Sequence, residues 1–180
     1  MMKQTDNNQL FYIYNNKGNK IGIKDRYSVH QNGDWHRGVQ LNLICGDLLL
    51  MQQRSNEVDI AKGLFDQTLT TQLIVEDNEN DFKALSRGLR EEIGIDINTL
   101  SVKHIAGPRK IIKRYEYDEA LYNREFVSLY QAYFPIQDLK PVNPKVRNLF
   151  WKPIGEVKKD AINNPKKYTK TFLMWLKEVM

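Results

Sequence analysis

The sequence has 180 residues, a formal net charge of +5 at pH 7 and a hydrophobic fraction of 41%. This length and composition are those of one compact globular domain rather than of a disordered chain. No apolar run approaches the roughly 18 residues that a membrane-spanning helix needs, so we expect no membrane partner.

Cysteine content and the first residues indicate the compartment. Residues Met1–Leu10 lack the basic head and apolar stretch of a secretory signal, and the single Cys45 cannot form an internal disulfide, so we expect a cytoplasmic protein. The positive residues are scattered, apart from one group near the C-terminus: Lys158, Lys159, Lys166, Lys167 and Lys170. This distribution favours an anionic small molecule over nucleic acid as the ligand. The sequence does not fix the oligomeric state, and a homodimer stays open.

The N-terminal part of the chain predicts two pairs of strands. Apolar and polar residues alternate through Leu10–Tyr14 and around Ile21 and Ile23, which predicts a hairpin within residues 1–26. Alternation resumes over 39–45, Gly46 and Asp47 turn the chain, and 48–54 returns. We expect this second pair to lie at the centre of a sheet.

Residues 56–72 have mixed polarity and no clear period, so they predict a long loop with one extended segment near 65–69. A helix follows, because apolar residues recur at helical spacing: Phe82, Leu85, Leu89 and Ile93. Asn80 or Asp81 would cap its start, and Gly94 would end it.

The rest of the chain predicts four strands and two helices. The strands span 102–106, 109–117, 125–134 and 148–151, and the helices span 154–162 and 168–179. The last helix would turn one apolar stripe to the core: Phe172, Trp175, Leu176 and Val179. No repeat or linker interrupts the sequence, so we predict a single domain over 1–180 that ends in C-terminal helices at 153–180.

Two glutamates near the end of the first predicted helix could hold a metal ion. Positions 88, 91 and 92 stand at i, i+3 and i+4, so their side chains share one face of a helix. Glu91 and Glu92 occupy two of these positions, and paired carboxylates suit a hard cation such as Mg²⁺. Taken alone, the pair is more typical of a solvated acidic face at the end of a surface helix.

A longer pattern changes that interpretation. The segment SRGLREEIGI, residues 86–95, resembles the end of the Nudix box, whose form is Arg-Glu-aliphatic-any-Glu-Glu-any-Gly-aliphatic. Glu79 stands eight residues before Arg87, where the box has its earlier glutamate. The resemblance implies an α/β fold, namely a Nudix-type α/β/α sandwich with a mixed β-sheet. It also implies Mg²⁺ or Mn²⁺ as the cofactor and a small-molecule diphosphate as the substrate.

The segment departs from the family pattern at two positions. Gly88 replaces the first glutamate, which in the family belongs to the metal and catalytic cluster. The opening glycine is also absent, since Leu73 stands there in a strict count, or Thr71 if the TTQL segment is equated with the family's Gly-His-Val. Reduced or altered catalysis is therefore an open alternative.

Positions outside the box resemble isopentenyl-diphosphate-isomerase-like Nudix proteins. They precede and follow the first long strands and recur in a late strand: Val29, His30, Gly33, His36, Arg37, Leu49, Leu50, Gln53, Arg54, Phe65, Asp66, Asn123, Glu125, Phe126, Val127 and Tyr130. The isomerase cysteine, glycine and histidine are replaced by Thr70, Thr71 and Gln72, however. Only the second of two late glutamates is present, as Glu125. The sequence therefore favours a hydrolase over an isomerase.

The resemblance assigns roles to particular residues. Glu79, Glu91 and Glu92 would bind the metal, and Glu79 could instead orient Arg87. Glu91, Glu92 and Glu125 would be catalytic, with Glu125 near the metal or acting as a general base. Three further residues would bind substrate phosphate at the mouth of the site: Arg54, His36 and Arg37.

Two functions stay open at this point. The first is a Mg²⁺-dependent hydrolase that cleaves a diphosphate linkage in a nucleoside-diphosphate-type or related small molecule. The second is a catalytically impaired Nudix-fold module for ligand binding or regulation, and Gly88 is the residue that discriminates between them. Substrate choice would lie in the loops at 56–72 and 113–124.

Overall fold

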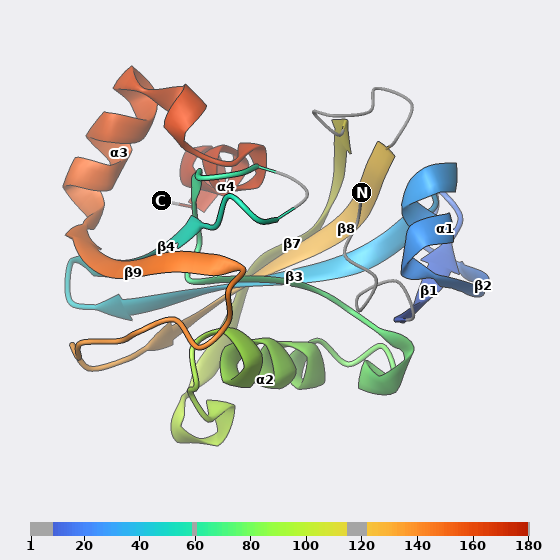
Figure 1. The fold of residues 1–180 in the computed structure, drawn as a ribbon, viewed down its shortest axis with the longest axis horizontal. Helices are drawn as coiled ribbons and strands as arrows, with labels where there is room; N and C mark the ends of the chain where they lie inside the picture. The colour runs from blue at the N-terminus through green and yellow to red at the C-terminus, as the bar shows by residue number, and fades with distance from the viewer. Residues whose placement is uncertain (1–8, 59–60, 115–121, 180) are drawn as a thin grey trace.

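The computed structural model describes residues 9–58, 61–114 and 122–179. These residues form a nine-stranded mixed sheet with α2 (Asp81–Glu92) on one face (Figure 1). Helices α3 (Ile154–Asn163) and α4 (Lys170–Val179) cover the other face. This arrangement confirms the predicted α/β/α sandwich. None of the helices in the described part of the chain is long and apolar enough to cross a membrane.

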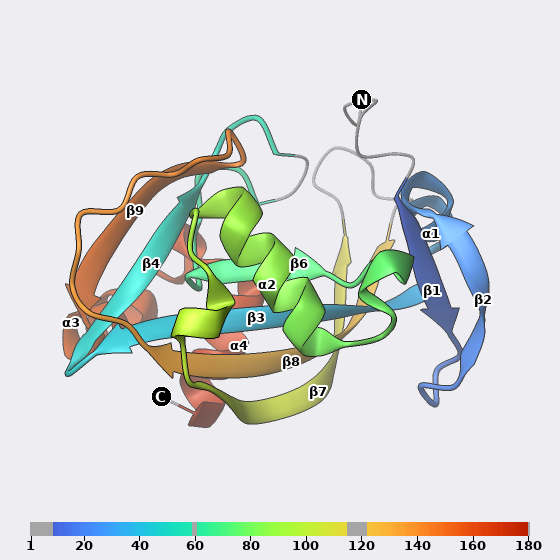
Figure 2. The ribbon, with the colours of Figure 1, turned by 90° about the horizontal axis from the view of Figure 1, so that it is seen from below.

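The N-terminal hairpin forms as predicted. Strand β1 (Leu10–Tyr14) pairs antiparallel with β2 (Lys20–Asp25). The last residue of β1 also pairs with Trp35, which joins the hairpin to the main sheet. Figure 2 shows the hairpin at one end of the molecule, beside the first helix.

The sequence analysis did not predict helix α1 (Arg26–Asn32), which directly follows the hairpin. Asp25 caps its start by accepting a hydrogen bond from the Ser28 amide at 2.9 Å. Gly33 ends it with φ at 64°, a left-handed conformation that glycine adopts without strain. At only two turns, α1 is too short to give a clear apolar period.

The second predicted pair lies at the centre of the sheet, as expected. Strand β3 (Trp35–Cys45) turns at Gly46, where φ is 59°, into β4 (Leu48–Arg54). Strand β3 also pairs antiparallel with β6 (Leu69–Gln72) and parallel with β8 (Tyr122–Tyr133), so the sheet is mixed. Four neighbours in the sheet, β1, β4, β6 and β8, make β3 the strand that fixes the site residues relative to one another.

The segment predicted as one extended stretch near 65–69 is two short strands. Strand β5 (Phe65–Asp66) pairs with β4, and β6 (Leu69–Gln72) pairs with β3. Thr68 stands between them, fully buried, and its hydroxyl donates to the Leu50 carbonyl. The change of pairing partner at Thr68 is a long-range event, and the local sequence pattern carries no sign of it.

The two strands predicted at 102–106 and 109–117 are one strand, β7 (Val102–Arg114), paired with β8. Its register shifts around Gly107, where φ is 102° and an added Cβ would lie 2.6 Å from the Val127 carbonyl oxygen. The predicted continuation through 115–117 lies outside the described residues. The last strand, β9 (Val146–Pro153), extends the predicted one in both directions and pairs with β4.

Helix α2 begins where its cap was predicted. The Asn80 side chain accepts hydrogen bonds from the amides of Phe82 and Lys83. Leu85 and Leu89 are fully buried in the main core cluster, but Phe82 is 44% exposed, contrary to prediction. Phe82 lies in the first turn, before the helix reaches that cluster. Two 3₁₀ turns flank the helix: η1 (Val75–Asp77) and η2 (Ile97–Thr99).

The C-terminal helix starts two residues later than predicted. After η3 (Pro165–Lys167), Tyr168 pairs with β5 in a parallel bridge. Thr169 then caps α4 by accepting a hydrogen bond from the Phe172 amide at 3.1 Å. Phe172 and Trp175 are fully buried, as the apolar stripe predicted, whereas the side chain of Val179 lies outside the described part.

Candidate active site

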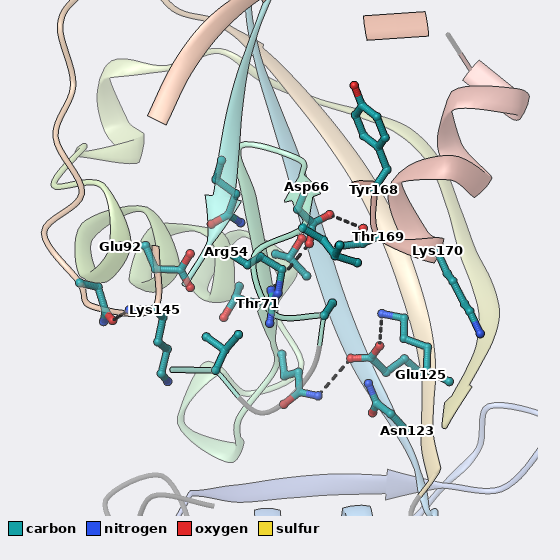
Figure 3. Close-up of a pocket in the computed structure, with 18 of the residues that line it drawn as sticks. Arg54, Asp66, Thr71, Glu92, Asn123, Glu125, Lys145, Tyr168, Thr169 and Lys170 are labelled. Carbon is teal, nitrogen blue, oxygen red and sulfur yellow. Dashed lines mark hydrogen bonds and ion pairs between the residues drawn. The ribbon is translucent and has the colours of Figure 1, made fainter. Parts of the chain in front are cut away.

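A cavity of about 880 Å³ lies between the end of α2 and the start of α4. Its described lining comes from Gln9, α1, β4, the loop segments 57–58 and 61–64, β5, β6, α2, β7, β8, the loop 143–145 and the segment 165–173. Figure 3 shows Glu92 and Lys145 on one side and Lys170 on the other. Four of the predicted site residues line this cavity: Arg54, Glu91, Glu92 and Glu125.

Glu91 and Glu92 form one wall, as their helical spacing predicted. The Glu91 carboxylate is half exposed and lies 3.5 Å from the Arg87 guanidinium. The Glu92 carboxylate is partly buried, points toward the cavity (Figure 3), and receives no hydrogen bond from the described residues. Burial raises the pKa of Glu92 to about 7, although the charges of Arg54 and Lys145 act to lower it. A cation beside this carboxylate would offset the cost of ionising it.

Asp77, rather than Glu79, holds Arg87. The Arg87 Nη2 donates to Asp77 Oδ2 at 2.8 Å and to the Gln72 carbonyl at 2.7 Å. Asp77 is itself buried and accepts a hydrogen bond from the Ile74 amide at 3.0 Å. Glu79 therefore does not take the orienting role that the resemblance implies. The η1 turn brings Asp77 inward, two residues earlier than the box spacing indicates.

Glu79 faces the N-terminal hairpin instead of the cavity. Its carboxylate accepts hydrogen bonds from the Tyr14 hydroxyl at 2.7 Å and from the Lys20 ammonium at 2.6 Å. The hydrogen bonds from Lys20 and Tyr14 lower the pKa of Glu79, so it is ionised and neutralised in place. We therefore remove Glu79 from the predicted metal ligands.

His36 and Arg37 also lie outside the cavity lining, contrary to prediction. His36 is fully buried, with Nδ1 3.1 Å from the Asp34 carbonyl oxygen. Arg37 donates to Asp81 Oδ1 at 2.6 Å and to the Glu79 carbonyl at 3.3 Å. Adjacent residues of a strand point to opposite faces of its sheet, so these two cannot serve one mouth together.

Glu125 lines the cavity away from Glu92 and is held by three side chains. Gln72 Nε2 donates to it at 3.1 Å and Lys113 Nζ lies 3.4 Å away, and these are the two dashed contacts of Glu125 in Figure 3. His36 Nε2 lies 3.7 Å away. Burial acts to raise the pKa of Glu125, but Lys113 and His36 outweigh it and keep the pKa well below its usual range. A carboxylate held ionised in this way is a weak proton acceptor.

The cavity floor joins three elements through Asp66. Its Oδ1 accepts a hydrogen bond from the Thr169 hydroxyl at 2.8 Å, and its Oδ2 lies 3.7 Å from the Arg54 guanidinium (Figure 3). Asp66 is 2% exposed, so both contacts are shielded from bulk water. Asp66 therefore holds Arg54, which the sequence analysis predicted to bind phosphate. The sequence analysis gave Asp66 itself no role in the site.

Further basic residues line the cavity, and the sequence analysis did not assign them to the site: Arg26, Lys113, Lys145, Lys166 and Lys170. Two of them belong to the C-terminal lysine group, which was visible in the sequence but carried no sign of its position. The others are separated by long stretches of chain, so only the folded chain brings them together.

Gly88 fills a packing role at this wall. A Cβ added there would lie 3.1 Å from both Cδ atoms of Leu69 and from Thr71 Cγ2. Gly88 is buried, and Thr71 lines the cavity. The glycine thus lets α2 approach β6 closely, where the family box carries a third carboxylate.

In the described part of the chain, few carboxylate, histidine or cysteine side chains lie close enough together to bind a divalent metal ion. Among the described residues, no group of three or more histidine, cysteine, aspartate or glutamate side chains is close enough to hold a metal. Magnesium is often bound through one or two carboxylates together with substrate phosphates and water. Glu91 and Glu92 fit this arrangement, in which substrate phosphates and water complete the coordination of the ion.

No family model matches this sequence, and no curated protein matches it either. Its structure, however, is similar to solved ones. The DR0079 protein of Deinococcus radiodurans superposes with a TM-score of 0.70 at 15% identity, covering 94% of this chain and 98% of that one.

Two further solved structures carry the family description. A Nudix hydrolase from Alicyclobacillus acidocaldarius superposes with a TM-score of 0.61 at 9% identity, covering 78% of this chain and 89% of that one. The Nudix domain of NrtR from Shewanella oneidensis, solved with ADP-ribose, superposes with a TM-score of 0.51 at 16% identity, covering 78% and 82%. None of the three is described as an isomerase, so the subgroup stays a prediction. The shared architecture shows that this chain has the fold of the Nudix hydrolases.

Proposed function

We propose that this protein is a Mg²⁺- or Mn²⁺-dependent hydrolase that cleaves a diphosphate linkage in a small molecule. One observation carries the proposal: Glu91 and Glu92 line the same cavity as several arginine and lysine side chains. Carboxylates suit the hard cation, and arginine and lysine suit phosphate oxygens. The Nudix fold supports the proposal, because the Alicyclobacillus relative is described as a hydrolase.

Glu91 and Glu92 would hold the ion on the last turn of α2. When bound, the ion neutralises phosphate charge and polarises the phosphorus toward attack by water. The two residues are adjacent on a helix whose inner face is buried, so the backbone that carries both carboxylates is fixed before substrate arrives. Arg87, held by Asp77, lies beside Glu91 and limits the movement of that carboxylate.

Arg54 and Lys113 would bind phosphate oxygens and orient the substrate. Asp66 holds Arg54 from the floor, and Glu125 holds Lys113 from the side wall. Each cation keeps donors for a ligand, since arginine carries five N–H groups and lysine three. Glu125 would then act as a positioning residue for Lys113 rather than as the general base.

A ligand-binding module without turnover is the second candidate. Two observations favour it: Gly88 occupies the third carboxylate position as a packing residue, and the described residues hold no three-ligand metal group. The Shewanella relative was solved with ADP-ribose, which makes that compound a suitable probe here. Tight binding of a diphosphate compound without release of product would favour this candidate over the enzyme.

The first test is a screen of nucleoside diphosphate sugars and dinucleotides with Mg²⁺ or Mn²⁺, in which product release is followed by chromatography. For the best substrate we expect turnover to need the metal. Exchange of Glu91→Gln and Glu92→Gln together should lower kcat by on the order of 100-fold, the scale seen when one preorganised electrostatic contact is lost.

A charge-matched variant controls for the loss of two negative charges. Glu76 and Glu156 are exposed and do not line the cavity, so Glu76→Gln/Glu156→Gln should leave kcat unchanged. Calorimetry with Mn²⁺ and a bound substrate or product gives a second readout. Equal metal affinity in wild type and in Glu91→Gln/Glu92→Gln would sink the metal assignment.

A further inference from the structure

The cavity is larger than a diphosphate group needs. Its volume of about 880 Å³ lies within the range that encloses a whole ligand of drug size. Glu92 and Lys170 lie on opposite sides of it (Figure 3). A diphosphate bound beside Glu91 and Glu92 would therefore leave the side near α4 to another part of the substrate.

That side is formed by the segment Pro165–Lys170, here termed the C-terminal wall. Its three lysines are not equivalent. Lys167 lies 3.4 Å from the Asp160 carboxylate and does not line the cavity. Lys166 and Lys170 do line it, and neither forms an ion pair with any residue of the described part of the chain. Two positive charges therefore border the cavity without an ion-pair partner among the described residues.

The backbone of the C-terminal wall is fixed independently of any ligand. The Thr169 amide donates to the Phe65 carbonyl at 3.0 Å, and the Thr169 hydroxyl donates to Asp66 at 2.8 Å. The Tyr168 hydroxyl donates to Asp160 Oδ2 at 2.7 Å. Binding at this wall would order little more than two lysine side chains, which keeps its entropic cost low.

Aromatic stacking offers little at this wall. Tyr168 is the one aromatic residue in the described lining, and its ring is already stacked on Phe172 at 5.2 Å between centroids. A second contact with Phe65 holds the ring at 5.6 Å. Recognition at the C-terminal wall must then rely on charge, and lysine ammonium groups are point charges that suit phosphate.

We propose that Lys166 and Lys170 form a second anion subsite, which binds a phosphate group of the substrate that lies beyond the diphosphate at Glu91 and Glu92. The inference rests on the proposed function for the first subsite. It narrows the substrate class to compounds with more phosphate than a single diphosphate. The extra phosphate can continue the same chain or stand on a separate ester.

Inorganic polyphosphates test the subsite without metal and without turnover. Affinities for diphosphate, triphosphate and tetraphosphate are measured by calorimetry in EDTA-containing buffer. Arg54 and Lys113 offer phosphate donors without the ion, and a longer flexible chain can extend from them toward Lys166 and Lys170. The test variant is Lys166→Gln/Lys170→Gln. The control is Lys159→Gln/Lys167→Gln, which removes the same charge from residues outside the cavity lining.

We expect wild type to bind the longer chains more tightly than diphosphate, and Lys166→Gln/Lys170→Gln to weaken that binding about tenfold. The loss of two exposed ion pairs weakens binding affinity by roughly 2- to 30-fold. The control variant should keep the wild-type affinities. Equal losses in both variants, or no preference for longer chains in wild type, would overturn the subsite.

A matched pair of dinucleotides distinguishes the two sources of the extra phosphate. NADP⁺ and NAD⁺ differ by one phosphate ester, and their binding is compared in Mg²⁺ buffer. A preference for NADP⁺ that is lost in Lys166→Gln/Lys170→Gln assigns the subsite to a separate ester, whereas a length effect with no NADP⁺ preference assigns it to a continuous chain. If diphosphates are hydrolysed but neither effect is seen, the subsite is wrong and the proposed function stands. If polyphosphates bind at Lys166 and Lys170 but no diphosphate is hydrolysed, the subsite stands and the proposed hydrolase function is wrong.

Discussion

Replacement of Gly88 by alanine tests whether this glycine serves packing. In a helix interior, alanine is more stable than glycine by about 1 kcal/mol. Here the new Cβ would lie 3.1 Å from both Cδ atoms of Leu69 and from Thr71 Cγ2. Overpacking of a dense core costs typically about 1–3 kcal/mol. The difference predicts a net destabilisation of about 0–2 kcal/mol, opposite in sign to the ordinary effect of this exchange.

The two neighbours differ in their freedom to move away. Leu69 is fully buried in the main core cluster, so its side chain has little room. Thr71 lines the cavity, so its methyl group is the contact that can be removed with least disturbance. Thr71→Ser deletes that methyl group, and in its background Gly88→Ala should be less destabilising than in wild type.

Urea denaturation of the four proteins of this cycle measures the predicted coupling. Gly155→Ala is the matched control, because Gly155 lies in α3 and an added Cβ there meets nothing within 4 Å. We expect Gly155→Ala to stabilise the protein by up to ~1 kcal/mol. If Gly88→Ala stabilises the protein as much as Gly155→Ala does, the close approach of α2 to β6 is not what requires the glycine. Position 88 would then be open to a carboxylate.

Three further predictions concern titration and ion pairs. Burial and the charge of His36 lower the pKa of His30 to about 2. Below about pH 6.5 His30 therefore takes up a proton only in the unfolded state, so the free energy of unfolding should fall by about 1.4 kcal/mol for each pH unit of acidification. Urea melts of His30→Gln between about pH 6 and pH 4 should show a flatter dependence; an unchanged slope contradicts the assignment. Glu79→Gln should lower the urea midpoint, because it weakens the contacts to Tyr14 and Lys20, while a fall in Mn²⁺ affinity would return Glu79 to the metal ligands. Asp77→Asn should cost about 2 kcal/mol, since it leaves the partly buried Arg87 charge with only the half-exposed Glu91 carboxylate beside it, and a change within experimental error would argue against that pair.

Elements with local signals could be predicted from the amino-acid sequence alone. Alternation over 10–14, 39–45 and 48–54 predicted the strands, and the spacing of Leu85 and Leu89 behind the Asn80 cap predicted α2. The α/β/α sandwich was expected from the resemblance to the Nudix box. Glu91 and Glu92 could be placed on one wall because adjacent helix positions keep their relation in any fold.

Which distant residues lie in the same cavity as those two carboxylates depends on how the chain folds. The change of strand partner at Thr68, the inward turn of Asp77 and the exposure of Phe82 all depend on contacts with remote parts of the chain. Motif spacing alone favoured Glu79 over Asp77, because spacing does not report which way a turn points. Likewise Lys170 reaches the cavity because the bridge of Tyr168 to Phe65 fixes the start of α4 on β5. That contact joins residues about a hundred positions apart, and no local pattern encodes it.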